Sequence, residues 1–113
     1  MQSFNLTQTL AHLRLDVPSF RPVARAYLHD VMEYLEAMDQ AHACREYATI
    51  AQSAQAMTRV ANVIHADELA HLASELATLA DAGDADGVGR SLRQLHLANL
   101  RITNTLRMIT DDE

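Results

Sequence analysis

The sequence predicts an all-α fold: one antiparallel, up-down four-helix bundle over residues 1–113, with a short N-terminal helix covering one end. Three observations predict this. Residues that favour helices are abundant, and there are only three glycines and two prolines. Apolar residues recur at spacings of three and four along four segments, which is the period of an amphipathic helix. A hydrophobic content of 49% is enough for a single core, and the length leaves no room for a second domain.

The N-terminal part of the chain predicts a short helix and then a long one. Residues 5–15 are expected to form the short helix, which ends ahead of Pro18. The first long helix is predicted over residues 19–42, with Pro18 and Ser19 marking its start. Pro22 is tolerated because it falls in the first turn. The core stripe of this helix is Ala24, Leu28, Val31, Leu35 and Met38.

The other three long helices follow from similar stripes. The second stripe is Tyr47, Ile50, Ala54, Met57, Ala61 and Ile64. It predicts that Met57 and Ile64 are buried, and that Gln55 is exposed beside them. The third stripe is Leu69, Leu72, Leu76 and Leu79; it follows Asp67, a plausible N-cap, and ends in a turn at 81–84. The fourth is Val88, Leu92, Leu95, Ile102, Leu106 and Ile109, interrupted by Asn99.

The connections between these helices are short, so neighbouring helices are expected to be antiparallel. The acidic tail, residues 111–113, is expected to be frayed.

Charge and composition exclude several functional classes. The net charge is -6, and the nine arginines are scattered along the chain, so nucleic acid is not expected as a partner. No apolar run is long enough for a membrane span, and no signal peptide is expected. A single cysteine, Cys44, fits a reducing compartment, and a cytoplasmic location is predicted. Cys44 itself is interpreted as a helix-start residue without evident reactivity.

Residues 54–69 resemble the signature of the histidine phosphotransfer (Hpt) family, A-H-x-L-K-G-x-A-x-x-[LI]-G-A-x-x-L. They read AQAMTRVANVIHADEL, and the apolar positions of the signature match at Ala54, Met57, Ala61, Ile64, Ala66 and Leu69. The resemblance extends over nearly the whole chain, through residues 18–20, 27–30 and 82–84. It implies a helical bundle in which a phosphorylated His, on the solvent side of one helix, receives phosphate from an aspartate of a receiver domain.

The residues that do or assist this chemistry are replaced. Gln55, Thr58 and Arg59 stand where the family has the phosphoacceptor His, a Lys and a Gly. A carboxamide is not a nucleophile at neutral pH, so phosphotransfer through Gln55 is not expected. The resemblance therefore implies a pseudo-Hpt protein, not an enzyme, that binds a receiver domain and competes with its other partners. Arg59 either blocks docking or reaches toward the acidic pocket of the receiver.

A polar row on the outer side of the same helix is the candidate docking surface. It consists of Gln52, Gln55, Arg59 and Asn62, with Ala48, Ala51 and Ala56 around it. Two interpretations stay open. The row is either an ordinary solvated surface or a site where small alanines let a partner approach closely.

The six histidines raise two further hypotheses. Glu68 and His71 have the Glu-x-x-His spacing of bundle di-iron sites, but no second copy of the motif exists, so neither a metal site nor a cofactor is expected. The pair is interpreted as exposed, like His29 with Glu33. His65 occupies a Gly position of the family and is the alternative phosphoacceptor. A third hypothesis, from a different class, is a helical adaptor or chaperone whose partner is not a receiver.

Overall fold

The computed structural model describes residues 4–111, which form five helices and no strand. The helices are α1 (Leu6–Leu13), α2 (Val17–Ala43), α3 (Tyr47–Val63), α4 (Asp67–Asp81) and α5 (Ala85–Thr110). The prediction of an all-α bundle is confirmed. Within the described range no helix is both long and apolar enough to cross a membrane. Of the acidic tail, residues 112 and 113 lie outside the described residues.

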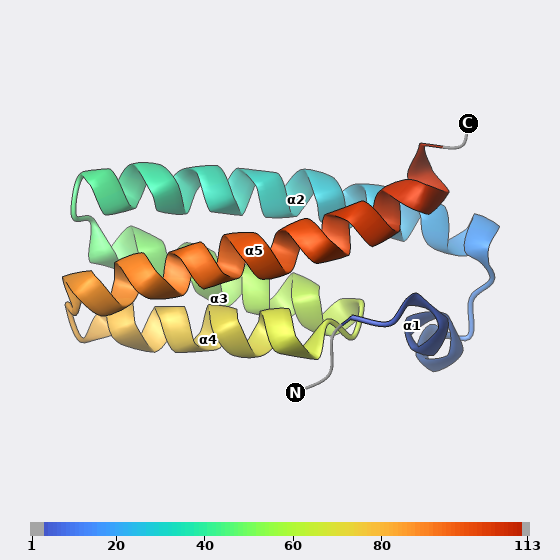
Figure 1. Ribbon diagram of the computed structural model, residues 1–113, viewed down its shortest axis with the longest axis horizontal. Helices are drawn as coiled ribbons and strands as arrows, with labels where there is room; N and C mark the ends of the chain where they lie inside the picture. Colours follow the sequence, from blue (N-terminus) through green and yellow to red (C-terminus); the bar gives the residue numbers. More distant parts are fainter. Residues whose placement is uncertain (1–3, 112–113) are drawn as a thin grey trace.

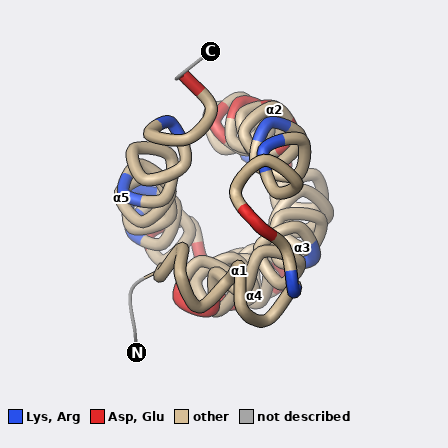
Figure 2. The backbone as a smooth tube through the Cα atoms, turned by 90° about the vertical axis from the view of Figure 1, so that its right-hand side faces the viewer, with Lys and Arg blue, Asp and Glu red and all other residues tan. Residues whose placement is uncertain are grey.

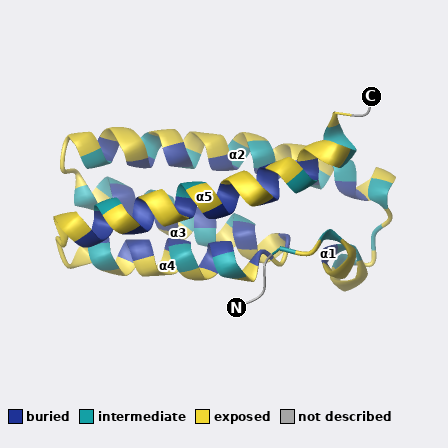
Figure 3. Ribbon diagram, in the orientation of Figure 1, coloured by how far each residue is buried: buried dark blue, intermediate teal, exposed yellow. Residues whose placement is uncertain are grey.

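The four long helices lie side by side, and the chain reverses direction from each to the next (Figure 1). Viewed from the end, they form a ring in which α5 closes against α2 (Figure 2). Their inward sides are buried along the whole bundle (Figure 3). The largest side chains without solvent exposure include Phe20, Met38, Ile50, Met57, Leu76 and Leu95.

The start of α2 differs from the prediction. The helix begins at Val17, because the side chain of Asp16 accepts a hydrogen bond of 2.9 Å from the backbone amide of Ser19 and caps it. Hydrogen bonding from Ser19, through its side chain first and its backbone amide second, lowers the pKa of Asp16. Pro22 therefore lies inside the helix, beyond its first turn, where it removes one backbone hydrogen bond. The predicted stripe also shifts, because Tyr27 is buried and Leu28 is only half-buried.

Helix α1 lies against the end of the bundle where α3 meets α4 (Figure 1). It is held there by the Thr9 hydroxyl, which is buried and donates a 2.7 Å hydrogen bond to the backbone carbonyl of Ile64. On the surface beside this contact, the rings of His12 and His65 stack with their centroids 4.4 Å apart. The expectation of a short helix at one end is thus met, with Asn5 as its N-cap.

A left-handed residue follows each of α2, α3 and α4. Arg45, His65 and Gly83 have φ angles of 57°, 56° and 68°. In each case the next residue donates its amide back across the last turn, as Glu46 does to the carbonyl of Ala41 at 2.8 Å. This is the Schellman arrangement, which satisfies carbonyls at a helix end and turns the chain sharply. Only one of the three positions is a glycine, so the turns at Arg45 and His65 carry side chains.

Two predictions about helix ends are wrong. Asp67 is the first residue of α4 and not its cap, because Ala66 takes the cap position and offers no side-chain hydrogen bond. Asp67 still carries negative charge in the first turn of α4, where it interacts favourably with the positive end of the helix dipole. Cys44 is the C-cap of α2 and does not start a helix. It is exposed and forms no disulfide.

One buried polar contact joins α2 to α5. The hydroxyl of Tyr27 donates a 2.8 Å hydrogen bond to Oδ1 of Asn99, and both residues are almost fully buried. The predicted interruption of the fourth stripe by Asn99 therefore lies inside the core, where it has a partner. Burial raises the pKa of the Tyr27 phenol above its ordinary value, because the charged form would lose its hydration.

We predict that Tyr27→Phe lowers the free energy of unfolding by about 1–3 kcal/mol, because it leaves the Asn99 amide buried without this partner. Urea denaturation measures the loss. The control is Tyr34→Phe, because the Tyr34 hydroxyl makes no hydrogen bond with any described residue and its removal should change little.

The raised pKa adds a pH dependence. In the unfolded chain Tyr27 ionises near its ordinary pKa of 10.0, whereas in the folded protein burial keeps the phenol neutral at that pH. The contribution of the neutral phenol to the free energy of unfolding is therefore complete below pH 10 and is lost as the pH rises above it. The wild type should therefore lose more stability above pH 10 than Tyr27→Phe does. Equal losses in the two proteins would contradict the assignment.

Candidate functional site

Helix α3 is buried along one side and exposed along the other, as its period requires. Ile50, Ala54, Met57 and Ala61 have no solvent exposure, and Ile64, just past the helix, is 1% exposed. Gln52, Gln55, Arg59, Asn62 and Ala48 are exposed, and Ala56 is half-buried. The prediction that Gln55 is exposed while Met57 and Ile64 are buried is confirmed.

One alanine of the predicted docking surface lies elsewhere. Ala51 is only 5% exposed and belongs to the core. It follows Tyr47 by four residues and precedes Ala54 by three, which puts it on the buried stripe instead of the outer one. The alanines beside the polar row are therefore Ala48 and Ala56.

The two replacements next to Gln55 have different surroundings. The hydroxyl of Thr58 is half-buried and donates a 2.9 Å hydrogen bond to the carbonyl of Ala54, one turn earlier in the same helix. It is therefore directed at its own backbone. Arg59 is exposed and forms no hydrogen bond or ion pair with any described residue. Its guanidinium is the positive charge of the row.

An apolar groove runs beside the polar row, between α3 and α2. Val60 and Val63 line it from α3, and Pro22, Val23 and Ala26 line it from α2. Val63 is 57% exposed, which is unusual for so apolar a side chain. Val60 follows Arg59 in sequence and Val63 follows Asn62, so the groove borders the C-terminal end of the row.

His65, the alternative phosphoacceptor, lies in the turn after α3 and not on the row. It has a left-handed backbone, with a φ angle of 56°, a conformation that Gly adopts at lower cost than other residues. The side chain is exposed, and its ring stacks on His12. The sequence indicated His65 as the alternative phosphoacceptor but gave no sign of His12 beside it, because α1 is distant in sequence.

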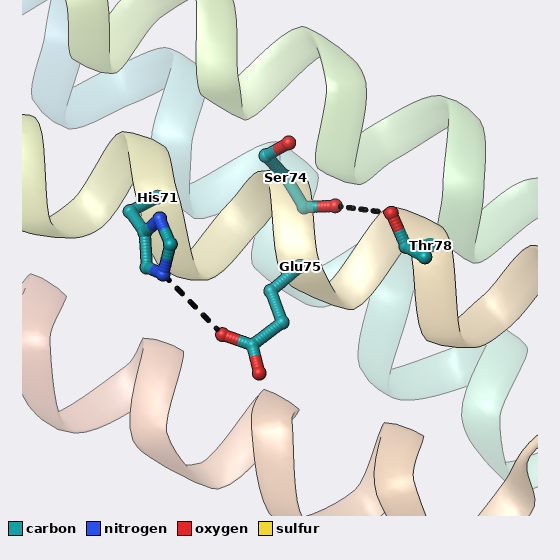
Figure 4. Close-up of polar contacts among 4 residues, drawn as sticks. All are labelled: His71, Ser74, Glu75 and Thr78. Atoms are coloured by element: carbon teal, nitrogen blue, oxygen red, sulfur yellow. Dashed lines mark hydrogen bonds and ion pairs between the residues drawn. The ribbon is translucent and has the colours of Figure 1, made fainter.

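The histidine and carboxylate pairs make surface contacts. Glu68 and His71 do not pair with each other, contrary to the sequence interpretation. His71 instead contacts Glu75 at 3.7 Å on the exposed side of α4 (Figure 4), and Glu68 accepts from Arg101 at 2.5 Å. His29 and Glu33 do pair, at 3.1 Å, and both are exposed. Among the described residues no three His, Cys, Asp or Glu side chains gather in a way that could hold a metal ion.

Sequence reasoning missed a second cluster, at the end of the bundle opposite α1. Arg45, Arg90 and Arg93 line one hollow together with His42. The arginines look scattered along the chain, because Arg45 is far in sequence from the other two. A signal was available in α5, which contains four arginines and, after Asp86, no acidic residue.

Comparisons with known proteins identify no relative. No family model matches the chain, and neither the curated proteins nor the solved structures contain a match.

We predict that Met57→Ala costs about 2–5 kcal/mol of stability, because it leaves a cavity in a closed part of the core. Gln55→Ala is the matched control in the same helix and should change stability by less than about 0.5 kcal/mol, since the side chain is exposed. Thermal and urea denaturation of the two variants test this. A large loss in Gln55→Ala would show that the polar row has a structural role.

Proposed function

We propose that the chain is a pseudo-Hpt protein: a bundle with the antiparallel, up-down arrangement of that family, which binds a receiver domain without accepting phosphate. One observation carries the proposal. The apolar positions of the signature are buried, whereas Gln55 and Arg59, at the reactive positions, are exposed on one side of α3. A bundle that keeps the packing pattern but has a carboxamide at the acceptor position retains a docking surface without a nucleophile.

The composition of the surface supports receiver binding. Gln52, Gln55 and Asn62 are uncharged, and Ala48 and Ala56 are small, so a partner can come close to α3. The groove lined by Val60 and Val63 adds apolar area next to the row. Arg59 supplies a single positive charge, which complements the acidic active site of a receiver domain.

The mechanism that follows is competition. A bound pseudo-Hpt protein covers the receiver surface that a phosphodonor or a genuine Hpt domain needs, and so lowers phosphate flow. Such interfaces are small and transient, and affinity in the micromolar range is expected. The proposal includes a cytoplasmic location, where receiver domains act and where the free thiol of Cys44 stays reduced.

A second candidate function is a helical adaptor, favoured by apolar residues elsewhere on the surface. Leu97, Leu100 and Met108 on α5 are 60%, 54% and 71% exposed, and Met32 on α2 is 53% exposed. A pull-down with the wild-type protein separates the two candidates. A receiver-containing protein that is lost with an Arg59 variant supports the first, and a partner that is lost only with Leu100→Asp supports the second.

We predict that the protein does not accept phosphate. Incubation with a phosphorylated receiver domain should leave no acid-labile, base-stable label, because Gln55 is not a nucleophile. Label that disappears in His65→Ala would instead establish the phosphocarrier alternative. A sharper test restores the reactive residues: Gln55→His with Thr58→Lys should gain such label if the receiver docks on α3. The single change Thr58→Lys is the matched control and should gain none.

We predict that Arg59 increases affinity for the receiver. Arg59→Ala and Arg59→Gly should both weaken binding by roughly 2- to 5-fold at low salt, the size expected of an exposed charge pair, and both should reduce its salt dependence. Arg107→Ala, an exposed arginine on α5, is the control and should bind like the wild type. Tighter binding by Arg59→Gly would show that the side chain is a steric block. Unchanged binding would place the interface elsewhere.

A further inference from the structure

The hollow that sequence reasoning missed lies between the α2–α3 turn and the first turns of α5. Arg45, Arg90 and Arg93 line it, with His42, Tyr47, Gly89 and, from the start of α5, Ala85 and Asp86. Three guanidinium groups therefore face a single carboxylate, in a protein whose net charge is -6. The hollow therefore has a local excess of positive charge, whereas the protein as a whole has an excess of negative charge.

The three arginines of the hollow have no polar partner among residues 4–111. None of Arg45, Arg90 and Arg93 makes a hydrogen bond or ion pair with any residue of the described range. By contrast, Arg101, on the same helix as two of them, is paired with Glu68. The guanidinium donors in the hollow are thus free to bind an anion, and their planar groups suit phosphate oxygens.

The backbone brings the arginines together from distant parts of the sequence. Arg45 occupies the left-handed position after α2, and its turn lies next to the start of α5. Arg90 and Arg93 are three residues apart, so they lie on the same side of α5. The left-handed backbone at Arg45 is unfavourable for a side chain other than Gly or Asn, yet a long cation is found there.

His42 and Gly89 complete the hollow. The imidazole makes no hydrogen bond with a described residue, and its Nδ1 is buried without a partner. Gly89 has no side chain between this ring and Arg93. A Cβ at Gly89 would lie 3.5 Å from His42 Nε2 and 3.7 Å from Arg93 Nη1. The gap between the His42 and Arg93 side chains is therefore kept open by a glycine in a helix interior, where Ala would be more stable.

We propose that this hollow is a binding site for a small phosphate-bearing anion, either free phosphate or a phosphomonoester, held by Arg45, Arg90 and Arg93. Its volume of about 510 Å³ is within the usual range for small-molecule sites, roughly 300–1,000 Å³. Asp86 opposes the anion and limits its affinity. The site is distinct from the polar row on α3, and the proposal does not depend on receiver binding.

The test is a titration of the full chain with inorganic phosphate at low ionic strength, followed by NMR. Amide signals of Gly89, Arg90 and Arg93 should shift together and saturate. Arg90→Gln combined with Arg93→Gln should weaken the affinity by about 10-fold or more, because it removes two charged donors. The control Arg107→Gln, at the other end of α5, should change affinity by less than about 2-fold, since no change is made in the hollow.

Two further variants separate binding from folding. Asp86→Asn removes the opposing charge and should raise the affinity by roughly 2- to 3-fold at low salt. Gly89→Ala should raise Tm, because Ala favours a helix, but should weaken phosphate binding by filling the gap between His42 and Arg93. Lower affinity in a variant with higher Tm cannot come from unfolding.

Titrations with AMP and with adenosine show whether the hollow binds a phosphomonoester or free phosphate. Tighter binding of AMP than of phosphate identifies a phosphomonoester site, and equal binding identifies a site for the free anion; both agree with the proposal. Three results would overturn it. The first is adenosine binding as tightly as AMP. The second is an unchanged affinity for phosphate in the variant that combines Arg90→Gln with Arg93→Gln. The third is that phosphate shifts the amide signals around Arg59 and Arg107 as much as those around the hollow.

Discussion

The burial of one side of α3 between α2 and α4 is the constraint on which the rest of the structure depends. Ala54, Met57 and Ala61 have no solvent exposure, and close packing at these positions fixes the rotation of the helix about its axis. Once that rotation is fixed, Gln55 and Arg59 have to be on the outside. The exposure of the candidate docking surface is therefore a consequence of core packing.

The sharp turns determine what lies at the two ends of the bundle. Helices α2, α3 and α4 are each followed by a left-handed residue, and two of these three residues are not glycine. His65 brings an imidazole next to His12 at the α1 end, and Arg45 brings a guanidinium to the start of α5 at the other end. A glycine at either position would form the same turn at lower conformational cost and would leave that end without the side chain.

Helix α5 differs from the rest of the protein in its charge, because it is basic. The helix carries four arginines and one acidic residue, whereas the rest of the chain is strongly acidic. One of these arginines, Arg101, is paired with Glu68 of the neighbouring helix α4, and two line the hollow. The buried contact of Asn99 with Tyr27 of α2 belongs to the same helix, and a polar pair inside the core favours one register of the two helices over sliding alternatives. That register also sets which arginines reach the α2–α3 turn.

The amino-acid sequence alone was enough to predict the local features: the number of long helices, the buried stripe of α3 and the exposure of Gln55. These follow from periodicity, because a helix presents residues three and four apart on the same side whatever it packs against. The start of α2, the capping of α4 and the burial of Ala51 were predicted wrongly. Asp16 accepts a hydrogen bond from the backbone amide of Ser19, so α2 begins earlier than predicted, and Ala51 lies on the buried stripe of α3 with Tyr47 and Ala54. Three contacts depend on the packing of the helices: Tyr27 with Asn99, His12 with His65, and Arg45 with Arg90 and Arg93 around one hollow. Each of these joins segments far apart in the chain, and such contacts depend on how whole helices pack, which no local pattern of residues encodes.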